Sequence, residues 1–171
     1  MIKNNIRVLL MASQNDTRDF YVAYAPPMGL YRLRHYLLQR GIECDILDLS
    51  IHSELEETYS HMVEQGKYNI VGMSVTHHNM VRELETLWKF RIASKKNAKK
   101  CLFIAGGQEA TLNYKQWLDA GIDLILLGFA EKTLYELCLR FPRGTDFENS
   151  EIVKGMDGYA LLDKTGQLIY S

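Results

Sequence analysis

Several features are scarce or missing in this sequence, and each absence narrows the class of protein. The three cysteines, Cys44, Cys101 and Cys138, lie far apart and form no C-x-x-C pair, so they lack metal-ligand spacing and suit small buried hydrophobic positions. No apolar run approaches the ~18 residues that a membrane-spanning helix needs. The net charge of −1 gives no electrostatic reason to expect a nucleic acid or an anionic membrane as partner. The N-terminus runs straight into an apolar segment without a secretory signal, so we expect a cytoplasmic protein.

Several catalytic and nucleotide-binding motifs are missing as well. The sequence contains neither G-x-G-x-x-G nor the P-loop pattern, which disfavours NAD and nucleoside triphosphates as ligands. It has no G-x-S-x-G, so a Ser–His–Asp hydrolase is not supported. Phosphoacceptor signalling domains need acidic residues after the first and third strands, where this chain has Ala12-Ser13 and Ser74-Val75.

What is present is a regular alternation of apolar strand-like runs and helical patterns. The predicted strands cover residues 6–12, 42–48, 69–75, 101–105 and 123–127. The predicted helices begin at Pro26-Pro27 and cover residues 53–64, 78–93, 111–120 and 131–139. Five β–α units with right-handed crossovers predict an α/β fold, a flavodoxin-like or Rossmann-like parallel sheet in the order 2-1-3-4-5 with helices on both faces, over residues 1–142.

Finer features of this pattern are also predicted. Ser53 with Glu56 three residues later reads as a capping box for the second helix. Helical spacing places Val81, Leu84, Leu87 and Trp88 on one face of the third helix. Beyond residue 142 the segments 151–154, 159–162 and 167–170 alternate between glycine-containing turns. They predict a small β-meander, a connector or lid that occupies residues 143–171.

Small and hydroxyl-bearing residues gather at the predicted strand ends. In open α/β sheets the ligand lies beyond the carboxyl ends of the strands. Glycine permits close approach of a ligand to the backbone, and the following helix N-termini favour an anionic group such as phosphate. The residues that these loops offer are Ser13, Gln14, Ser74, Thr76, His77, Gly106, Gly107, Gln108, Gly128 and Phe129. Two alternatives stay open: the glycine pair can simply form a tight turn, and His77 can cap a helix rather than contact a ligand.

Six loose motifs, in order, match one family. They are Pro26 to Leu30, Gly41 to Asp48, Asn69 to Thr76, Gly106 to Thr111, Gly128 to Leu137, and the pair formed by residues 152–155 and 163–166. The pattern resembles the N-terminal cobalamin-binding domain of B12-dependent radical SAM enzymes, over nearly the whole chain. Ala110 replaces the family's usual proline, and Phe129-Ala130 replaces a Glu-Gly, so the segment after the fifth predicted strand departs from the family's pattern.

The resemblance implies a binding mode for cobalamin. Its nucleotide tail would pass Ser74, Thr76, Gly106 and Gly107, and its corrin ring would lie over the strand ends. The matched motifs add Thr111, Glu131 and Thr133 to the cofactor-binding residues. D-x-H-x-x-G, which supplies an axial histidine in methionine-synthase-like domains, is absent, so we expect base-off cobalamin without a histidine ligand. Tyr21 or Tyr24 is the candidate to cover the lower face of the corrin.

The same resemblance implies a larger enzyme. The C-x-x-x-C-x-x-C motif for the iron–sulfur cluster does not occur. The cluster and S-adenosylmethionine are therefore expected only in a radical SAM domain that acts in cis or in trans, with methyl transfer as the expected reaction and no catalytic residue in this chain. The rival interpretations are a flavodoxin-like interaction or sensory domain without cofactor, and a flavin-binding electron carrier.

Overall fold

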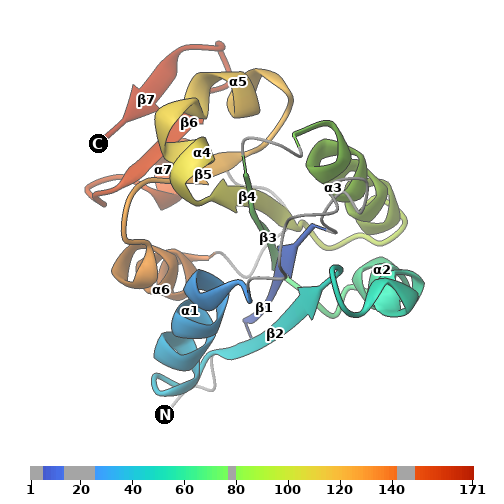
Figure 1. The fold of residues 1–171 in the computed structure, drawn as a ribbon. Helices are drawn as coiled ribbons and strands as arrows, with labels where there is room; N and C mark the ends of the chain where they lie inside the picture. Colours follow the sequence, from blue (N-terminus) through green and yellow to red (C-terminus); the bar gives the residue numbers. More distant parts are fainter. Residues whose placement is uncertain (1–5, 14–25, 77–79, 142–148) are drawn as a thin grey trace, which may run out of the picture.

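The computed structural model describes residues 6–13, 26–76, 80–141 and 149–171. In these residues one sheet of seven strands is flanked by helices (Figure 1). The strands are β1 Arg7–Ala12, β2 Glu43–Asp48, β3 Ile70–Ser74, β4 Leu102–Gly106, β5 Leu124–Leu126, β6 Tyr159–Leu162 and β7 Leu168–Tyr170. The helices are α1 Met28–Leu38, the 3-10 turn η1 Ser53–Leu55, α2 Glu56–Glu64, α3 Met80–Ser94, α4 Gln108–Leu112, α5 Tyr114–Asp119, α6 Glu131–Arg140 and α7 Asn149–Ile152.

The strand order is β2-β1-β3-β4-β5-β6-β7, with the first five strands parallel. The predicted order 2-1-3-4-5 is therefore confirmed. The register aligns the last residues of the parallel strands: Ala12 lies opposite Asp48 and Ser74, and Gly106 lies opposite Ser74 and Leu126. One edge of the sheet thus carries the carboxyl ends of β1 to β5 in a row, where such folds bind ligands.

The C-terminal residues continue this sheet, which gives it seven strands in the described chain rather than the predicted five. β6 pairs antiparallel with β5, and β7 pairs antiparallel with β6. The prediction of a strand over residues 151–154 is wrong, because α7 begins this segment. Ile152 and Val153 are both buried in the same hydrophobic cluster, as in a helical turn, whereas a strand would send neighbouring side chains to opposite faces. The predicted boundary at residue 142 lies outside the described residues.

The helices divide between the two faces of the sheet (Figure 1). On one face α1 and α6 pack on alternate strand residues such as Val8, Leu10 and Ile104. On the other face α2, α3 and α5 pack on the intervening residues, including Leu9 and Phe103. We refer to these as the α1/α6 face and the α2/α3 face. The alternation follows from the two-residue period of a strand that is buried on both sides.

Three helix predictions need correction. Ser53 lies within η1, and no described side chain caps the start of η1 or of α2, so the capping box does not form. The predicted helix 111–120 is two short helices that meet at Asn113. The predicted face of α3 is right in part: Leu84 and Leu87 pack on the core, whereas Val81 is 73% exposed and Trp88 is 43% exposed. The helix is turned so that Glu83, Leu87 and Phe90 are buried.

Candidate cofactor site

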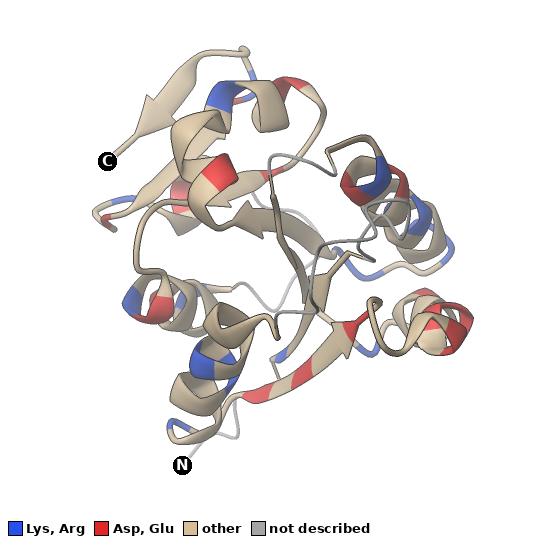
Figure 2. Ribbon diagram, in the orientation of Figure 1, with Lys and Arg blue, Asp and Glu red and all other residues tan. Residues whose placement is uncertain are grey.

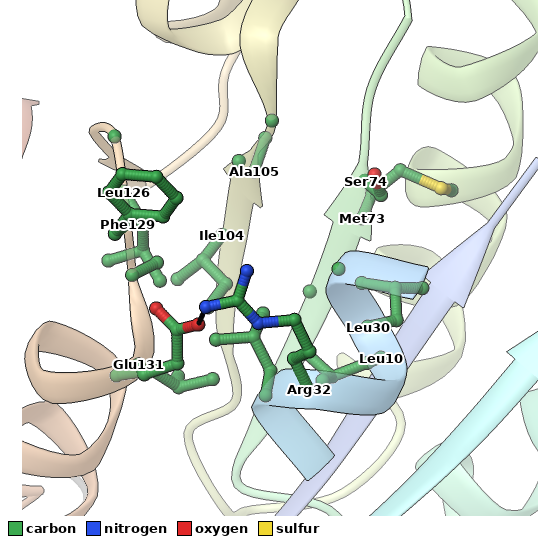
Figure 3. A pocket seen from close by; sticks show the side chains of 18 residues that line it. Leu10, Leu30, Arg32, Met73, Ser74, Ile104, Ala105, Leu126, Phe129 and Glu131 are labelled. Atoms are coloured by element: carbon green, nitrogen blue, oxygen red, sulfur yellow. Dashed lines mark ion pairs between the residues drawn. The ribbon is translucent and has the colours of Figure 1, made fainter. Parts of the chain in front are cut away.

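A slot opens between the sheet and the two helices of the α1/α6 face (Figure 3). Its volume is about 200 Å³. It extends from the carboxyl ends of β3, β4 and β5 into the space beneath α1 and α6. Its lining residues, which define the slot, are Leu10, Gly29, Leu30, Arg32, Leu33, Gly72, Met73, Ser74, Ile104, Ala105, Gly106, Gly107, Leu126, Gly128, Phe129, Ala130, Glu131 and Leu134.

Gly72 forms the floor of the slot. It sits in the middle of β3, with Leu10 and Ile104 as its neighbours on β1 and β4. A Cβ atom at Gly72 would lie 3.0 Å from Cδ2 of Leu10 and 3.1 Å from Cγ1 of Ile104. The missing side chain belongs to the α1/α6 face, because the adjacent Ile70 is buried there and Val71 is buried on the other. Glycine at this position therefore keeps the slot open.

The upper wall of the slot is built from short residues at the strand ends. Ser74 and Gly106 close β3 and β4, and Gly107 follows with a φ of 105°, a left-handed value that favours glycine. A Cβ atom at Gly107 would lie 3.1 Å from the carbonyl oxygen of Val75. Backbone groups are thus open to a ligand where longer side chains would cover them.

Thr111 fixes two of the loops around the slot. Its hydroxyl donates to the carbonyl oxygen of Gly107 at 2.9 Å and accepts from the backbone N–H of Gly128 at 3.2 Å. Gly107 follows β4 and Gly128 follows β5, so one hydroxyl couples the two loops. Thr111 acts on the slot through these loops, since it is not among the lining residues.

The mouth of the slot carries an ion pair and an exposed ring. Arg32 of α1 reaches across to Glu131 of α6, with 2.7 Å between Nη2 and Oε1 (Figure 3). Phe129 is 85% exposed, and the centre of its ring lies 5.8 Å from the guanidinium carbon of Arg32. A large exposed aromatic side chain beside an opening is a natural contact for a bulky ligand.

A buried carboxyl group organises the rim beside the slot. The Oε1 atom of Glu83, on α3, accepts hydrogen bonds from the hydroxyl of Ser13 at 3.2 Å, the backbone N–H of Thr76 at 2.9 Å and the hydroxyl of Thr76 at 3.0 Å. The side chain is 0% exposed, and Oε2 has no hydrogen-bond partner among the residues that the structure describes. Burial raises the pKa of Glu83 to about 7, against the hydrogen bonds from Thr76 and Ser13, and Glu109 adds to the rise. Glu83 therefore holds the ends of β1 and β3 and can exchange its proton near neutral pH.

The predicted site residues separate into distinct groups. The slot brings together Ser74, Gly106, Gly107, Gly128, Phe129 and Glu131. Ser13 and Thr76 bond to Glu83 instead. Gln108 is exposed at the start of α4 and does not line the slot, and Thr133 is buried where its hydroxyl donates to the carbonyl oxygen of Asp157 at 3.0 Å. Gln14, Tyr21, Tyr24 and His77 lie outside the described residues.

Three residues of the site were not singled out from the sequence: Arg32, Gly72 and Glu83. Gly72 had a usable signal, since a glycine inside an apolar strand marks close approach of another group. Arg32 and Glu83 had none, because their roles depend on how α1 and α3 are rotated against the sheet.

Other kinds of site are not seen in the described ranges. No three His, Cys, Asp or Glu side chains in those ranges are grouped so that they could hold a metal ion. No helix that the structure describes is both long and apolar enough to cross a membrane. Cys44 and Cys138 are buried as predicted and Cys101 is half-buried, and burial raises the pKa of all three thiols to about 12. All three are therefore neutral thiols at physiological pH.

The family model of the B12 binding domain matches residues 21–138. The chain belongs to the B12-binding domain family. This confirms the resemblance seen in the sequence motifs, and cobalamin is accordingly the cofactor of the domain. A comparison with curated proteins found no match.

Solved structures share the fold of this B12-binding domain. The cobalamin-dependent S-adenosylmethionine radical enzyme OxsB with aqua-cobalamin bound superposes with a TM-score of 0.74 at 14% identity, over 97% of this chain and 22% of that chain. The same enzyme with aqua-cobalamin and S-adenosylmethionine bound gives 0.67 at 15% identity. Its apo form gives 0.68 at 15% identity. This B12-binding domain thus spans about a fifth of the length of OxsB.

The slot fits one part of cobalamin. The cofactor carries a flat apolar benzimidazole at the end of a nucleotide tail, and the inner slot is lined by Leu10, Ile104 and Leu134 over a glycine floor. Its volume of about 200 Å³ falls below the roughly 300–1,000 Å³ of sites that enclose a whole small molecule. The slot would therefore hold an arm of a large ligand and leave the rest above the strand ends.

Proposed function

We propose that this domain binds cobalamin in the base-off form, with the nucleotide tail in the slot and no histidine ligand to cobalt. The observation that carries the proposal is the slot itself, an apolar space with a glycine floor that opens at the carboxyl ends of the parallel strands. Base-off binding follows from it, because a benzimidazole inserted beneath α1 and α6 is withdrawn from the corrin ring.

The inner part of the slot would bind the benzimidazole by burial. Leu10, Ile104 and Leu134 offer aliphatic surface, and the absence of a side chain at Gly72 leaves room for a ring against the sheet. Burying apolar surface stabilises the complex in proportion to the area removed from water. Ser74 and the open backbone at Gly106 and Gly107 would then face the polar ribose and phosphate of the tail.

The corrin ring would lie above the strand ends, beside Phe129. The sequence has no histidine between residues 1 and 34, so the long first loop cannot supply an axial imidazole. His35, His52 and His61 are exposed on or near α1 and α2 and do not line the slot. His77 and His78 follow β3 and lie outside the described residues, and the motif D-x-H-x-x-G that would supply an axial histidine does not occur in the sequence. We therefore propose cobalt without a histidine ligand, with Tyr21 or Tyr24 as the cover of the lower face.

In a larger assembly, the domain would deliver its cofactor to a radical SAM domain, in cis or in trans. Bound cobalamin would supply a carrier for a methyl group, and the residues of this chain would bind and orient it. The likeness to part of OxsB and the order of the sequence motifs support this role. Methyl transfer is the reaction that we propose for the complete enzyme.

The visible spectrum of the loaded protein tests this function. Purified protein is mixed with hydroxocobalamin, free ligand is removed by desalting, and the spectrum is recorded. We expect retained corrin absorbance of the base-off type. Protein that retains no corrin would overturn the proposal, and a base-on spectrum would overturn the binding mode alone.

A variant that fills the slot links the spectrum to the site. Gly106→Val adds methyl groups at the end of β4, where the Cβ atom would lie 3.5 Å from the Leu126 carbonyl oxygen, an ordinary contact. We expect Gly106→Val to fold and to lose cobalamin. Ile92→Val, a change at an exposed position of α3 away from the slot, is the control and should bind like the wild type. Undiminished binding by folded Gly106→Val would exclude the slot as the site.

A further inference from the structure

The seam between α1 and α6 is held differently at its two ends. One turn beyond Arg32 and Glu131, the rings of Tyr36 and Tyr135 pack edge to face with centroids 6.3 Å apart. The guanidinium of Arg40 lies 3.5 Å from the centre of the Tyr36 ring and 5.7 Å from that of Tyr135. Aromatic packing therefore fixes the far end, whereas an ion pair joins the two helices at the mouth of the slot.

The two partners of this ion pair are also the charged residues of the slot lining. Among the described residues that line it, Arg32 carries the single positive charge and Glu131 the single negative charge. The side chain of Arg32 is 63% exposed, so its guanidinium can turn at low cost, while Glu131 is 19% exposed. An ion pair with one solvent-exposed partner is weak, because water screens the charges and the long side chain loses freedom, so a better partner can displace Glu131.

Glu131 keeps a favourable environment without Arg32. It is the first residue of the ten-residue helix α6. A carboxylate in the first turn is stabilised by the partial positive charge of the helix N-terminus. Separation of the pair therefore leaves Glu131 charged and favourably placed, and it releases the guanidinium beside the slot.

We propose that the Arg32–Glu131 ion pair is a latch across the slot, and that Arg32 exchanges Glu131 for the phosphodiester of the nucleotide tail when cobalamin binds. With the benzimidazole in the apolar inner slot, the phosphodiester, which precedes it in the tail, lies nearer the mouth. Its negative charge then meets the single cation of the slot lining. Guanidinium groups bind phosphate oxygens with two parallel hydrogen bonds, which a single carboxylate oxygen at 2.7 Å does not use fully.

This inference rests on the proposed binding of cobalamin, and two ligands separate the two claims. Cobalamin carries the phosphodiester, whereas cobinamide lacks the phosphate, the ribose and the base. The dissociation constants of both ligands are measured for the wild type and for Arg32→Gln, Glu131→Gln and Lys132→Gln. Lys132 is the matched control, since it is the neighbour of Glu131, pairs with Glu136 and does not line the slot.

We expect Arg32→Gln to weaken cobalamin binding about tenfold, the scale of one hydrogen bond to a charged group, and to leave cobinamide binding unchanged. Glu131→Gln should strengthen cobalamin binding by roughly two- to fivefold, because the competing partner is gone. Lys132→Gln should match the wild type for both ligands. Raising the ionic strength should weaken cobalamin binding by the wild type and have less effect on Arg32→Gln.

The results of these measurements separate the latch from the proposed function. If the wild type binds no cobalamin, the proposed function fails. If the wild type binds cobalamin and Arg32→Gln binds it equally well, with the same salt dependence, the latch is wrong and the proposed function stands. Weaker cobalamin binding by Glu131→Gln would also overturn the latch, because it would make Glu131 a direct support of the bound state rather than a competitor for Arg32.

Discussion

The two faces of the sheet are packed with different side chains. The α2/α3 face holds the largest fully buried side chains of the described residues, including Trp117, Tyr68, Phe90 and Phe103. The α1/α6 face is built mainly from leucine, isoleucine and valine, and β3 carries Gly72 on this face. One face is filled by the chain itself, and the other leaves a space that the chain does not fill.

This difference explains how one sheet can be stable and still leave space for a ligand. Interiors are close-packed, and an unfilled space forgoes contacts that would stabilise the fold. Aromatic packing on the α2/α3 face supplies stability that the α1/α6 face gives up. Figure 2 shows charged residues mainly on the helices and along β2, and few at the ends of β3 to β5. The exceptions at the slot are Arg32 and Glu131.

The largest effect on stability is expected from removing a large buried side chain on the α2/α3 face. Phe103 is buried on β4 with its ring 4.5 Å from the guanidinium carbon of Arg91. Phe103→Ala should lower the free energy of unfolding by about 3–5 kcal/mol, because it leaves a cavity in close-packed surroundings. Chemical denaturation of the protein without ligand measures the change.

Leu139→Ala is the control for that change. Leu139 is exposed on α6, and its truncation should stay within about 0.5 kcal/mol of the wild type. An equally small effect of Phe103→Ala would show that the α2/α3 face does not carry the stability of the domain.

A smaller effect is expected from Glu83, the buried acid of the α2/α3 face. Its folded pKa of about 7 lies above the ordinary value of 4.5, so the folded protein keeps a proton that the unfolded chain releases between these pH values. Its contribution to the free energy of unfolding therefore falls as pH rises from about 4.5 to 7, and it levels off above that. The loss is on the order of 3 kcal/mol.

Glu83→Gln isolates this titration, because glutamine keeps an oxygen acceptor for Ser13 and Thr76 and carries no charge. The difference in the free energy of unfolding, wild type minus Glu83→Gln, should fall between pH 5 and pH 8. Chemical denaturation at both pH values gives this difference. A difference that stays constant would mean that Glu83 does not titrate in this range.

The third effect on stability is expected from filling the slot on the α1/α6 face. Gly72→Val places two methyl groups against Leu10 and Ile104, whose flexible side chains must move. We expect a loss of about 1–3 kcal/mol from overpacking, with a retained fold and loss of cobalamin binding. Circular dichroism and equilibrium binding check the two parts. A folded Gly72→Val protein that binds cobalamin like the wild type would place the tail elsewhere.

The sequence predicted the parallel sheet well because that part of the fold has strong local signals. Apolar runs such as residues 6–12 alternate with helical patterns, and right-handed crossovers leave few possible orders. The C-terminal strands were found, but their pairing with β5 depends on a free sheet edge that local patterns do not reveal. Residues 151–154 were misread because Ile152 and Val153 suit a strand by type, whereas both side chains pack on one cluster.

The site was predicted in outline only. Ser74, Gly106 and Gly107 follow strands, so their place at the rim could be inferred. Glu83 could not, because the helical spacing of Val81 and Trp88 indicated a different buried face for α3. The slot also depends on the distance at which α1 and α6 pack on the sheet, and no short sequence window encodes that distance.

Methyl NMR of the 19.7-kDa protein tests the central claim most directly, since both faces of the sheet carry buried methyl groups. Cobalamin is added to protein labelled at its leucine and isoleucine methyl groups. We predict large changes in the methyl chemical shifts of Leu10, Ile104 and Leu134 in the slot. The chemical shifts of Leu87 and Leu118 on the α2/α3 face should change little. Changes centred on Leu87 and Leu118, or bound cobalamin that leaves the slot methyls unmoved, would contradict the account.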